Sequence, residues 1–184
     1  GNILDFENLT KDNIYVLESP ILSNSQFKKF KVFFKDSLKV LDCTFDVQNN
    51  LKKGLDQLCS EAEIAVREGC KHLILSDKKI SEKKASVPMI LVFGAINSKL
   101  VNLGIRGFVS INIQTGEVLD THSFAVLLGV GATTINPYLV FDSIYQRYEK
   151  KLFGKFSFEE CIKRYIKSVD NGLLKIMSKM GISV

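Results

Sequence analysis

The sequence from Phe124 to Tyr138, FAVLLGVGATTINPY, carries the strongest signal for the fold. It begins with an apolar run of β-type composition, Phe124 to Leu128, and glycines follow at positions 129 and 131. The chain then reaches Asn136 and Pro137, which are typical of the start of a helix. The pattern predicts a strand, a glycine-rich turn and a helix in succession, as in an α/β protein.

Upstream, the sequence predicts a β–α–β unit. Lys39 to Phe45 has the composition of a strand, and His72 to Leu75 is a second apolar run. Between them, apolar residues recur at helical spacing, and Gly69 stands where a C-terminal glycine cap belongs; they are Leu51, Leu55, Leu58, Cys59, Ala62, Ala65 and Val66. Two strands joined through a helix are expected to be parallel.

Downstream, the same alternation continues. We expect helices from Pro88 to about Leu103, from Pro137 to Lys150 and from Ser157 to about Met180, and a third strand from Phe108 to Ile113. The turn Thr115 to Glu117, followed by Val118 and Leu119, predicts a hairpin with one antiparallel edge. The predicted fold class is α/β, with a mostly parallel sheet flanked by helices, like part of a β/α barrel.

The chain divides at residue 38. We interpret residues 1–38 as an irregular lead-in arm or a short helical lead-in, because two short apolar clusters are separated by polar stretches. Residues 39–184 are expected to form one α/β domain, since this length is enough to bury a sizeable core.

Composition argues against nucleic acids and membranes as partners. The net charge is +5, but the lysines are dispersed, and the densest group, Asp77 to Lys84, alternates with acids as a solvated loop does. No aromatic stacking platform accompanies it. Because no apolar run reaches the roughly 18 residues of a spanning helix, we expect a soluble, intracellular protein.

Cysteine and histidine spacing predicts no metal site. Cys43, Cys59, Cys70 and Cys161 contain no CxxC pair, and neither His72 nor His122 is paired with any of them. Dispersed cysteines of this kind fit a reducing compartment, where they act as small core residues.

Few residues suggest chemistry. Asp42, Asp46 and Asp77 follow predicted strands, where α/β folds commonly bind ligands, although carboxylates there also cap turns. Glu61 and Glu63 lie two apart on a predicted helix and so face different ways. His122 is interpreted as a polar strand-edge residue and Cys43 as a buried thiol. We therefore assign no catalytic, cofactor-binding or metal-binding residue in this segment.

The glycine turn supports an alternative function. If Gly129 to Thr134 followed a strand and opened a helix, the chain could be a free-standing α/β domain that binds a phosphorylated small ligand or a flavin at this turn. The third glycine of a dinucleotide fingerprint would fall at Thr134, however, so a structural turn is the preferred interpretation.

Several ordered blocks resemble the central domain of the large subunit of glutamate synthase. They are ESPILS (18–23), LDCTFD (41–46), LCSEAEIAVREG (58–69), LILSD (73–77), PMILVFGAINSKLVNLGIR (88–106), the 124–138 stretch and LLKIMSKMGIS (173–183). The chain departs from the family pattern at Asn97, Ser98 and Lys99, at Ser123 after His122, and at Val130. The first four departures replace histidines typical of the family, Val130 replaces a tyrosine, and the apolar strand and helix positions are unchanged.

The resemblance implies a part of an enzyme that carries none of its chemistry. It implies a non-catalytic connecting domain, excised from a larger chain. That domain would link the glutamine amidotransferase and FMN-binding synthase domains and help to form the ammonia tunnel for glutamate synthesis from glutamine and 2-oxoglutarate. FMN and an iron–sulfur cluster belong to the parent oxidoreductase, a small NAD(P)H-oxidising subunit is a further partner that the family allows, and the expected location is the cytoplasm, or an organelle in a eukaryote.

A segment of this kind should expose apolar docking residues toward its neighbouring domains. The candidates lie in the aromatic lead-in: Phe6, Leu9, Phe27, Phe30, Phe33 and Phe34.

Overall fold

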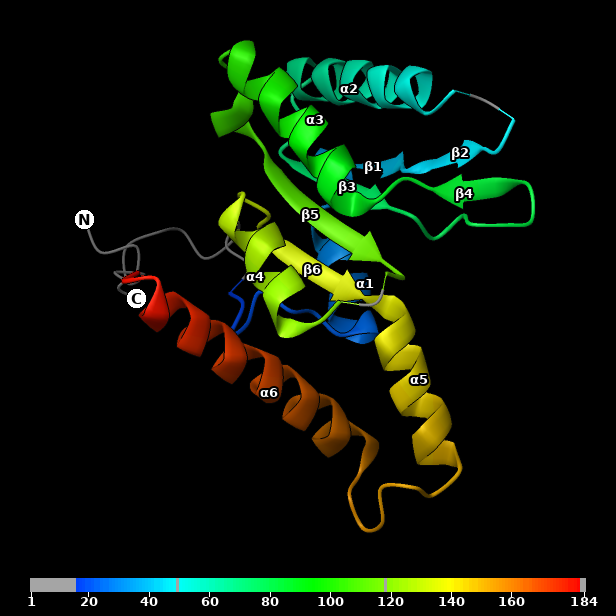
Figure 1. The fold of residues 1–184 in the computed structure, drawn as a ribbon, viewed down its shortest axis with the longest axis vertical. Helices are drawn as coiled ribbons and strands as arrows, with labels where there is room; N and C mark the ends of the chain where they lie inside the picture. Colours follow the sequence, from blue (N-terminus) through cyan, green and yellow to red (C-terminus); the bar gives the residue numbers. More distant parts are fainter. Residues whose placement is uncertain (1–15, 49, 118, 183–184) are drawn as a thin grey trace.

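The fold is an open parallel sheet with helices on both faces (Figure 1). The computed structural model describes residues 16–48, 50–117 and 119–182. Its helices are α1 (Asn24–Phe33), α2 (Leu51–Arg67), α3 (Met89–Asn102), α4 (Thr121–Gly129), α5 (Tyr138–Glu149) and α6 (Phe158–Lys179), with 3₁₀ turns η3 (Lys35–Ser37) and η4 (Arg106–Phe108). Its strands are β1 (Leu38–Asp42), β2 (Thr44–Asp46), β3 (His72–Ser76), β4 (Lys84–Ser86), β5 (Ser110–Thr115) and β6 (Thr134–Pro137).

The main sheet confirms the predicted fold class. Its four strands run in the order β1-β3-β5-β6, and every neighbouring pair is parallel. The predicted unit of strand, helix and strand is β1, α2 and β3, and Gly69 adopts the positive φ of +93° expected after the helix. The carboxyl ends of the four strands therefore meet at one edge of the sheet.

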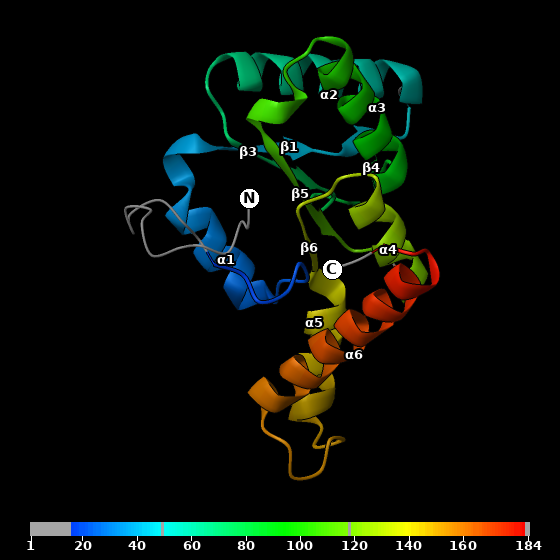
Figure 2. The same cartoon turned by 90° about the vertical axis from the view of Figure 1, so that its left-hand side faces the viewer.

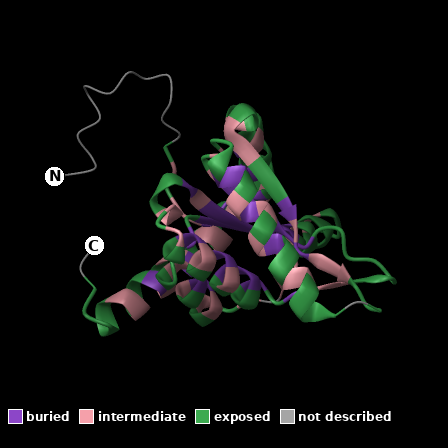
Figure 3. Cartoon of the chain, turned by 90° about the horizontal axis from the view of Figure 1, so that it is seen from above, coloured by how far each residue is buried: buried purple, intermediate pink, exposed green. Residues whose placement is uncertain are grey.

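The two faces of the sheet differ in chemistry. Odd-numbered residues of the central strands, such as Leu73, Leu75 and Ile113, pack into the main core with side chains of α2, α3, α4 and α6. Even-numbered residues are mostly polar, and Ile74 alone joins Leu22, Phe27 and Phe30 in a second apolar cluster. Figure 2 shows α1 on one side of the sheet and α3 and α4 on the other, and Figure 3 shows the buried strands beneath the exposed outer faces of the helices.

The apolar run Phe124 to Leu128 is helical, so its prediction as the fourth strand is wrong. It forms most of α4, whose N-cap Asp120 accepts a hydrogen bond from the Ser123 N–H. Phe124 and Leu127, three residues apart, are the buried side chains, which is helical spacing. A short apolar run fits either structure by periodicity alone, and the cap residue decides this one. The fourth strand is instead β6, within the predicted turn and helix start.

The predicted hairpin at Thr115 to Leu119 is also wrong. β5 pairs only in parallel, with β3 and β6, and the chain after it enters α4; Val118 lies outside the described residues. The antiparallel pair forms elsewhere, between β2 and β4, because the predicted Lys39 to Phe45 strand breaks at Cys43. The Cys43 N–H and C=O bond to the Ser76 carbonyl and the Val87 N–H, where the chain leaves the main sheet.

The lead-in contains a regular helix. α1 begins with a capping box between Ser23 and Gln26, and Ile21 pairs in parallel with Ile135 at the edge of β6. Phe27 and Phe30 are buried in the chain's own core, so their prediction as docking residues is wrong. Phe33 is 47% exposed, Phe34 is half-buried, and Phe6 and Leu9 lie outside the described residues.

The last two helices form a hairpin that extends beyond the sheet (Figures 1 and 2). α6 begins with the predicted capping box of Ser157 and Glu160. Aromatic rings join the two helices: Phe141 meets Tyr165 at 5.5 Å and Tyr145 meets Phe158 at 5.4 Å between centroids. Near its other end, α6 passes so close to α4 that a Cβ on Gly172 would collide with the Thr121 methyl group.

Candidate functional site

The candidate site lies at the carboxyl edge of the sheet, around Asp77. This carboxylate directly follows β3 and is fully buried. It accepts the Thr115 hydroxyl at 2.6 Å and the Gly116 N–H at 3.0 Å, both from the end of β5. The Tyr138 hydroxyl, at the start of α5, also bonds to it. Burial, together with the Asp77 charge, raises the pKa of Tyr138 to about 12, so the phenol remains a donor.

A ladder of polar side chains crosses the sheet beside Asp77. The Ser76 hydroxyl donates to the side-chain oxygen of Gln114 at 2.9 Å, and the side-chain amide of Gln114 donates to the side-chain oxygen of Asn136 at 3.1 Å. Asn136 in turn donates to the Leu22 backbone carbonyl and to Asn24, at 2.9 Å each. One row nearer the amino ends, Thr134 donates to Asn112 at 2.8 Å. The ladder thus fastens three strands and the segment before α1 together.

Asp42 and Asp46 act as turn caps. Asp42 accepts the Thr44 N–H at 3.1 Å and the Thr44 hydroxyl at 2.7 Å, and Lys79 and Lys84 each lie 3.6 Å away. Partial burial opposes ionisation, but these hydrogen bonds and lysines lower the pKa of Asp42. Asp46 accepts the Gln48 N–H at the surface. The structure places Asp42 and Asp77 at the same edge, on neighbouring strands, each with its own partners.

The other sequence candidates are dispersed. Cys43 is buried, and desolvation raises its pKa to about 12, far from that of a nucleophilic thiol. Glu61 accepts the Gln57 amide, and Glu63 pairs with Arg67 and Lys99 at the surface. His122 is exposed in the first turn of α4, so its prediction as a strand-edge residue is wrong.

The Gly129 to Thr134 turn has the wrong geometry for a phosphate. It follows a helix and precedes β6, so it lies at the amino edge of the sheet, opposite the carboxyl edge where α/β folds bind ligands. Its N–H groups are already used: those of Val130, Gly131 and Ala132 bond to carbonyls of α4, and that of Thr133 bonds to Ile111.

The side chain of Arg106 closes this turn. It donates to the Gly131 carbonyl at 3.0 Å, to the Val109 carbonyl at 2.7 Å and to Asn97 at 2.7 Å. Asn97 is one of the departures from the family pattern, and Lys99, another, pairs with Glu63. Both residues therefore have structural contacts in this chain.

The described residues contain neither a metal-ligand cluster nor a helix that could span a membrane. Across residues 16–48, 50–117 and 119–182, three or more His, Cys, Asp or Glu side chains do not gather as a metal site would require. In those same ranges, each helix is too short or too polar to cross a membrane.

The carboxyl-edge site is a closed hydrogen-bond network. Every fully buried side-chain nitrogen or oxygen within the described ranges has a partner. Sequence reasoning found Asp77 but missed Gln114, Asn136 and Tyr138. The alternation of Ser110, Asn112 and Gln114 along β5 is the signal that could have revealed the polar face. An arrangement of this kind holds three strands in one register, and breaking it would leave buried polar groups without partners.

Comparison with known proteins shows which family the chain is similar to. A family model described as "Glutamate synthase central domain" matches residues 1–184. The chain is 44% identical over 187 residues to the glutamate synthase [NADPH] large chain of Azospirillum brasilense, covering 100% of this chain and 12% of that protein. It is 38% identical to the corresponding large chain of Bacillus subtilis, covering 91% of this chain and 11% of that protein. It is 36% identical to the chloroplastic ferredoxin-dependent glutamate synthase of Oryza sativa, again covering 100% and 12%.

Proposed function

The chain belongs to the glutamate synthase central domain family, and from that membership we propose that it is the non-catalytic connecting domain of a glutamate synthase large chain. In this proposal, it joins a glutamine amidotransferase domain to an FMN-binding synthase domain of the same polypeptide and helps to wall the tunnel that carries ammonia between them. The parent enzyme would be an oxidoreductase with FMN and an iron–sulfur cluster, both held outside this segment.

One observation carries the proposal. The full length of this chain matches relatives of which it spans only 12%, so its counterpart in those proteins is one segment among several. The relatives named for NADPH and for ferredoxin both contain it, so the segment is independent of the electron donor that the relatives' names give.

The character of the carboxyl edge supports a scaffold role. The side chains at this edge bind one another: Asp77 is fully engaged by Thr115, Gly116 and Tyr138. Ammonia that crosses between two active sites must avoid protonation in bulk water, which favours a rigid, well-packed wall. A dense core with a fastened polar face provides that rigidity.

The test is the balance between glutamine used and glutamate formed by the full large chain. In the unmodified large chain, one glutamine should be consumed for each 2-oxoglutarate that is converted to glutamate, and little free ammonia should be released. The variant Asp77→Asn should keep glutaminase activity but release ammonia into solution, because the network that holds β3, β5 and α5 together is loosened. Glu63→Gln, a surface change on α2, is the matched control and should leave the balance intact.

The proposal fails if a folded Asp77→Asn enzyme, checked by thermal unfolding, releases no more ammonia than the unmodified enzyme. Supplying ammonia directly separates the cases further. A connecting role predicts that synthesis from added ammonia persists in the variant.

A further inference from the structure

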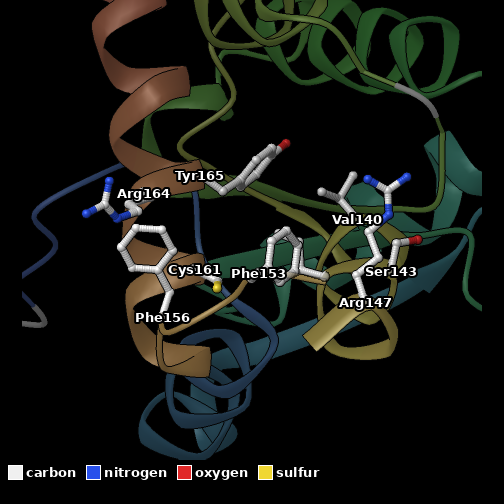
Figure 4. Close-up of a pocket in the computed structure, with 9 residues that line it drawn as sticks. Val140, Ser143, Arg147, Phe153, Phe156, Cys161, Arg164 and Tyr165 are labelled. Atoms are coloured by element: carbon white, nitrogen blue, oxygen red, sulfur yellow. The ribbon is translucent and has the colours of Figure 1, made fainter. Parts of the chain in front are cut away.

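The hairpin of α5 and α6 carries a groove that the carboxyl-edge site does not include. A cavity of about 520 Å³ opens between the two helices near their connecting loop, lined by residues that include Val140, Ile144, Phe153, Phe156 and Tyr165. Figure 4 shows the aromatic rings gathered between the helices. The hairpin extends away from the sheet (Figure 1), and two residues that line the groove, Ile144 and Tyr165, also pack against the edge of the main core.

Two arginines flank the apolar floor. Arg147 on α5 and Arg164 on α6 both line the groove, and they stand on opposite sides of the aromatic rings (Figure 4). The Arg164 guanidinium lies 4.1 Å from the centre of the Phe156 ring, a cation–π contact that fixes its plane. Neither arginine forms a salt bridge within the described part of the chain.

The surroundings are also basic. Lys150, Lys151 and Lys155 lie in and beside the loop that joins the helices, and Lys163 and Lys167 follow on α6. The acidic residues from Tyr138 to Lys167 are Asp142, Glu149, Glu159 and Glu160, four against seven basic residues. A partner that fits this surface combines an apolar side chain, for the floor, with carboxylates placed to meet the two arginines.

We propose that this groove binds an acidic segment of the same large chain, outside residues 1–184, that inserts an apolar side chain between Arg147 and Arg164. The inference rests on the proposed function, because it requires the longer polypeptide. The relatives supply such polypeptide in abundance, since the matched segment is 12% of their length. Covalent linkage makes a modest groove sufficient, because the effective concentration of a tethered segment is high.

The test is the chemical accessibility of the groove in the full large chain. Ser143 lines the groove and is exposed in this structure, whereas Gln146 is exposed on the same helix and does not line it. Ser143→Cys and Gln146→Cys are labelled with a maleimide, and the modified peptides are quantified by mass spectrometry so that the native cysteines do not interfere. We expect position 143 to react at least ten times more slowly than position 146.

Charge variants then identify the occupant. With Ser143→Cys as the reporter, Arg147→Glu combined with Arg164→Glu should expose the groove and restore fast labelling. Arg147→Lys combined with Arg164→Lys, which keeps the charge, should retain most of the protection. Thermal unfolding of each variant confirms that the chain remains folded. Protection that is unchanged by charge reversal overturns the acidic occupant.

The remaining outcomes separate this inference from the function. Equal labelling of positions 143 and 146 in a large chain overturns the groove proposal and leaves the proposed function intact. Protection that disappears on dilution identifies a second copy as the occupant and also overturns it. A native product of about the mass of this chain alone removes the proposed function, and the groove proposal with it.

Discussion

The two faces of the sheet solve the same problem of burial in different ways. On one face, side chains such as Leu73 and Ile113 are fully buried among apolar residues of four helices. On the other, equally buried side chains bond to polar neighbours on the next strand: Asn112 accepts from Thr134, and Asn136 accepts from Gln114 and donates to the Leu22 carbonyl before α1. The apolar face gains stability from the area it removes from water, whereas the polar face adds little net energy but fixes which groups must meet.

This difference matters for the connecting role that we propose. A purely apolar face tolerates small rearrangements, because dispersion contacts are not directional. A ladder of hydrogen bonds across β3, β5 and β6 requires one register and one position of the Leu22 to Asn24 segment. In the proposed role, neighbouring domains would therefore bind to surfaces whose relative positions are fixed. The following predictions test the contrast, from the largest effect to the smallest.

Deleting a large side chain from the apolar face should have the largest effect. Phe93 on α3 is fully buried in the main core. Phe93→Ala should lower the free energy of unfolding by about 3–5 kcal/mol, the usual cost of a large cavity. Phe108→Ala is the control, since Phe108 is 72% exposed, and it should cost less than about 0.5 kcal/mol in urea unfolding. Equal costs would show that Phe93 is not packed as described.

Removing the Asp77 carboxylate should come second. Asp77→Ala leaves the Thr115 hydroxyl and the Gly116 N–H without their acceptor in a buried place. We expect the free energy of unfolding to fall by about 2–4 kcal/mol, because buried donors that lose a charged acceptor have no other hydrogen-bond partner. Asp46→Ala, which removes only an exposed turn cap, should cost less than about 1 kcal/mol by the same measurement. A smaller effect at Asp77 than at Asp46 would contradict the closed network.

Interrupting the ladder should have an intermediate effect. Gln114→Leu keeps roughly the same volume but removes the acceptor for Ser76 and the donor to Asn136. A loss of about 1–3 kcal/mol is expected. Amide hydrogen exchange should also quicken in β6 and near Leu22, because the ladder reaches both. If exchange changes only at position 114 itself, the ladder does not couple the strands.

The close crossing of α4 and α6 tests packing beyond the apolar face. Gly172→Ala should destabilise the chain by about 1–2 kcal/mol, since the new methyl group would meet the Thr121 methyl carbon. Thr121→Ser removes that carbon and should restore part of the loss in the double variant. Additive effects in thermal unfolding would mean that the two residues do not touch.

The smallest predicted effect concerns the Glu117 carboxylate, which contacts Met89 at the start of α3. The Glu117 carboxylate accepts the Met89 N–H at 2.7 Å. Burial raises the pKa of Glu117 by more than this hydrogen bond lowers it, so the pKa is raised overall. The folded state therefore binds a proton more readily than the unfolded state, and the stabilisation present below about pH 4.3 is lost as pH rises through the raised pKa. Glu117→Gln should abolish this component, which is below about 1 kcal/mol because the group is partly exposed. A variant whose pH–stability curve in urea unfolding matches the parent would contradict the burial of Glu117.

Regular features with long periodicity were predictable from sequence. The stripe of α2, its glycine cap and the capping box at Ser157 each contain several residues that agree, and the structure confirms all three. The run from Phe124 to Leu128 was not predictable by period, since five apolar residues suit a helix or a strand. Its assignment depends on Asp120 as a cap and on tertiary contacts of Phe124 and Leu127.

The candidate site shows the same division. Asp77 stands out in sequence because it ends a strand, but its partners come from β5 and α5, 38 residues and more along the chain. Position in sequence indicates the carboxyl edge, and only the parallel order of β3 and β5 brings Thr115 to Asp77. Similarly, the glycine turn resembles a phosphate loop in sequence. In the structure, its N–H groups bond to carbonyls of α4 and β5, and its Gly131 carbonyl accepts from Arg106.

The most direct test of the account is the mass of the native protein that contains residues 1–184. An antibody raised against this segment, or intact mass analysis of the native product, would measure it. The proposed connecting role predicts a polypeptide many times larger than the 20.7 kDa of this chain, with amidotransferase and flavin-binding domains on either side. A native product of about 20.7 kDa would contradict the connecting role.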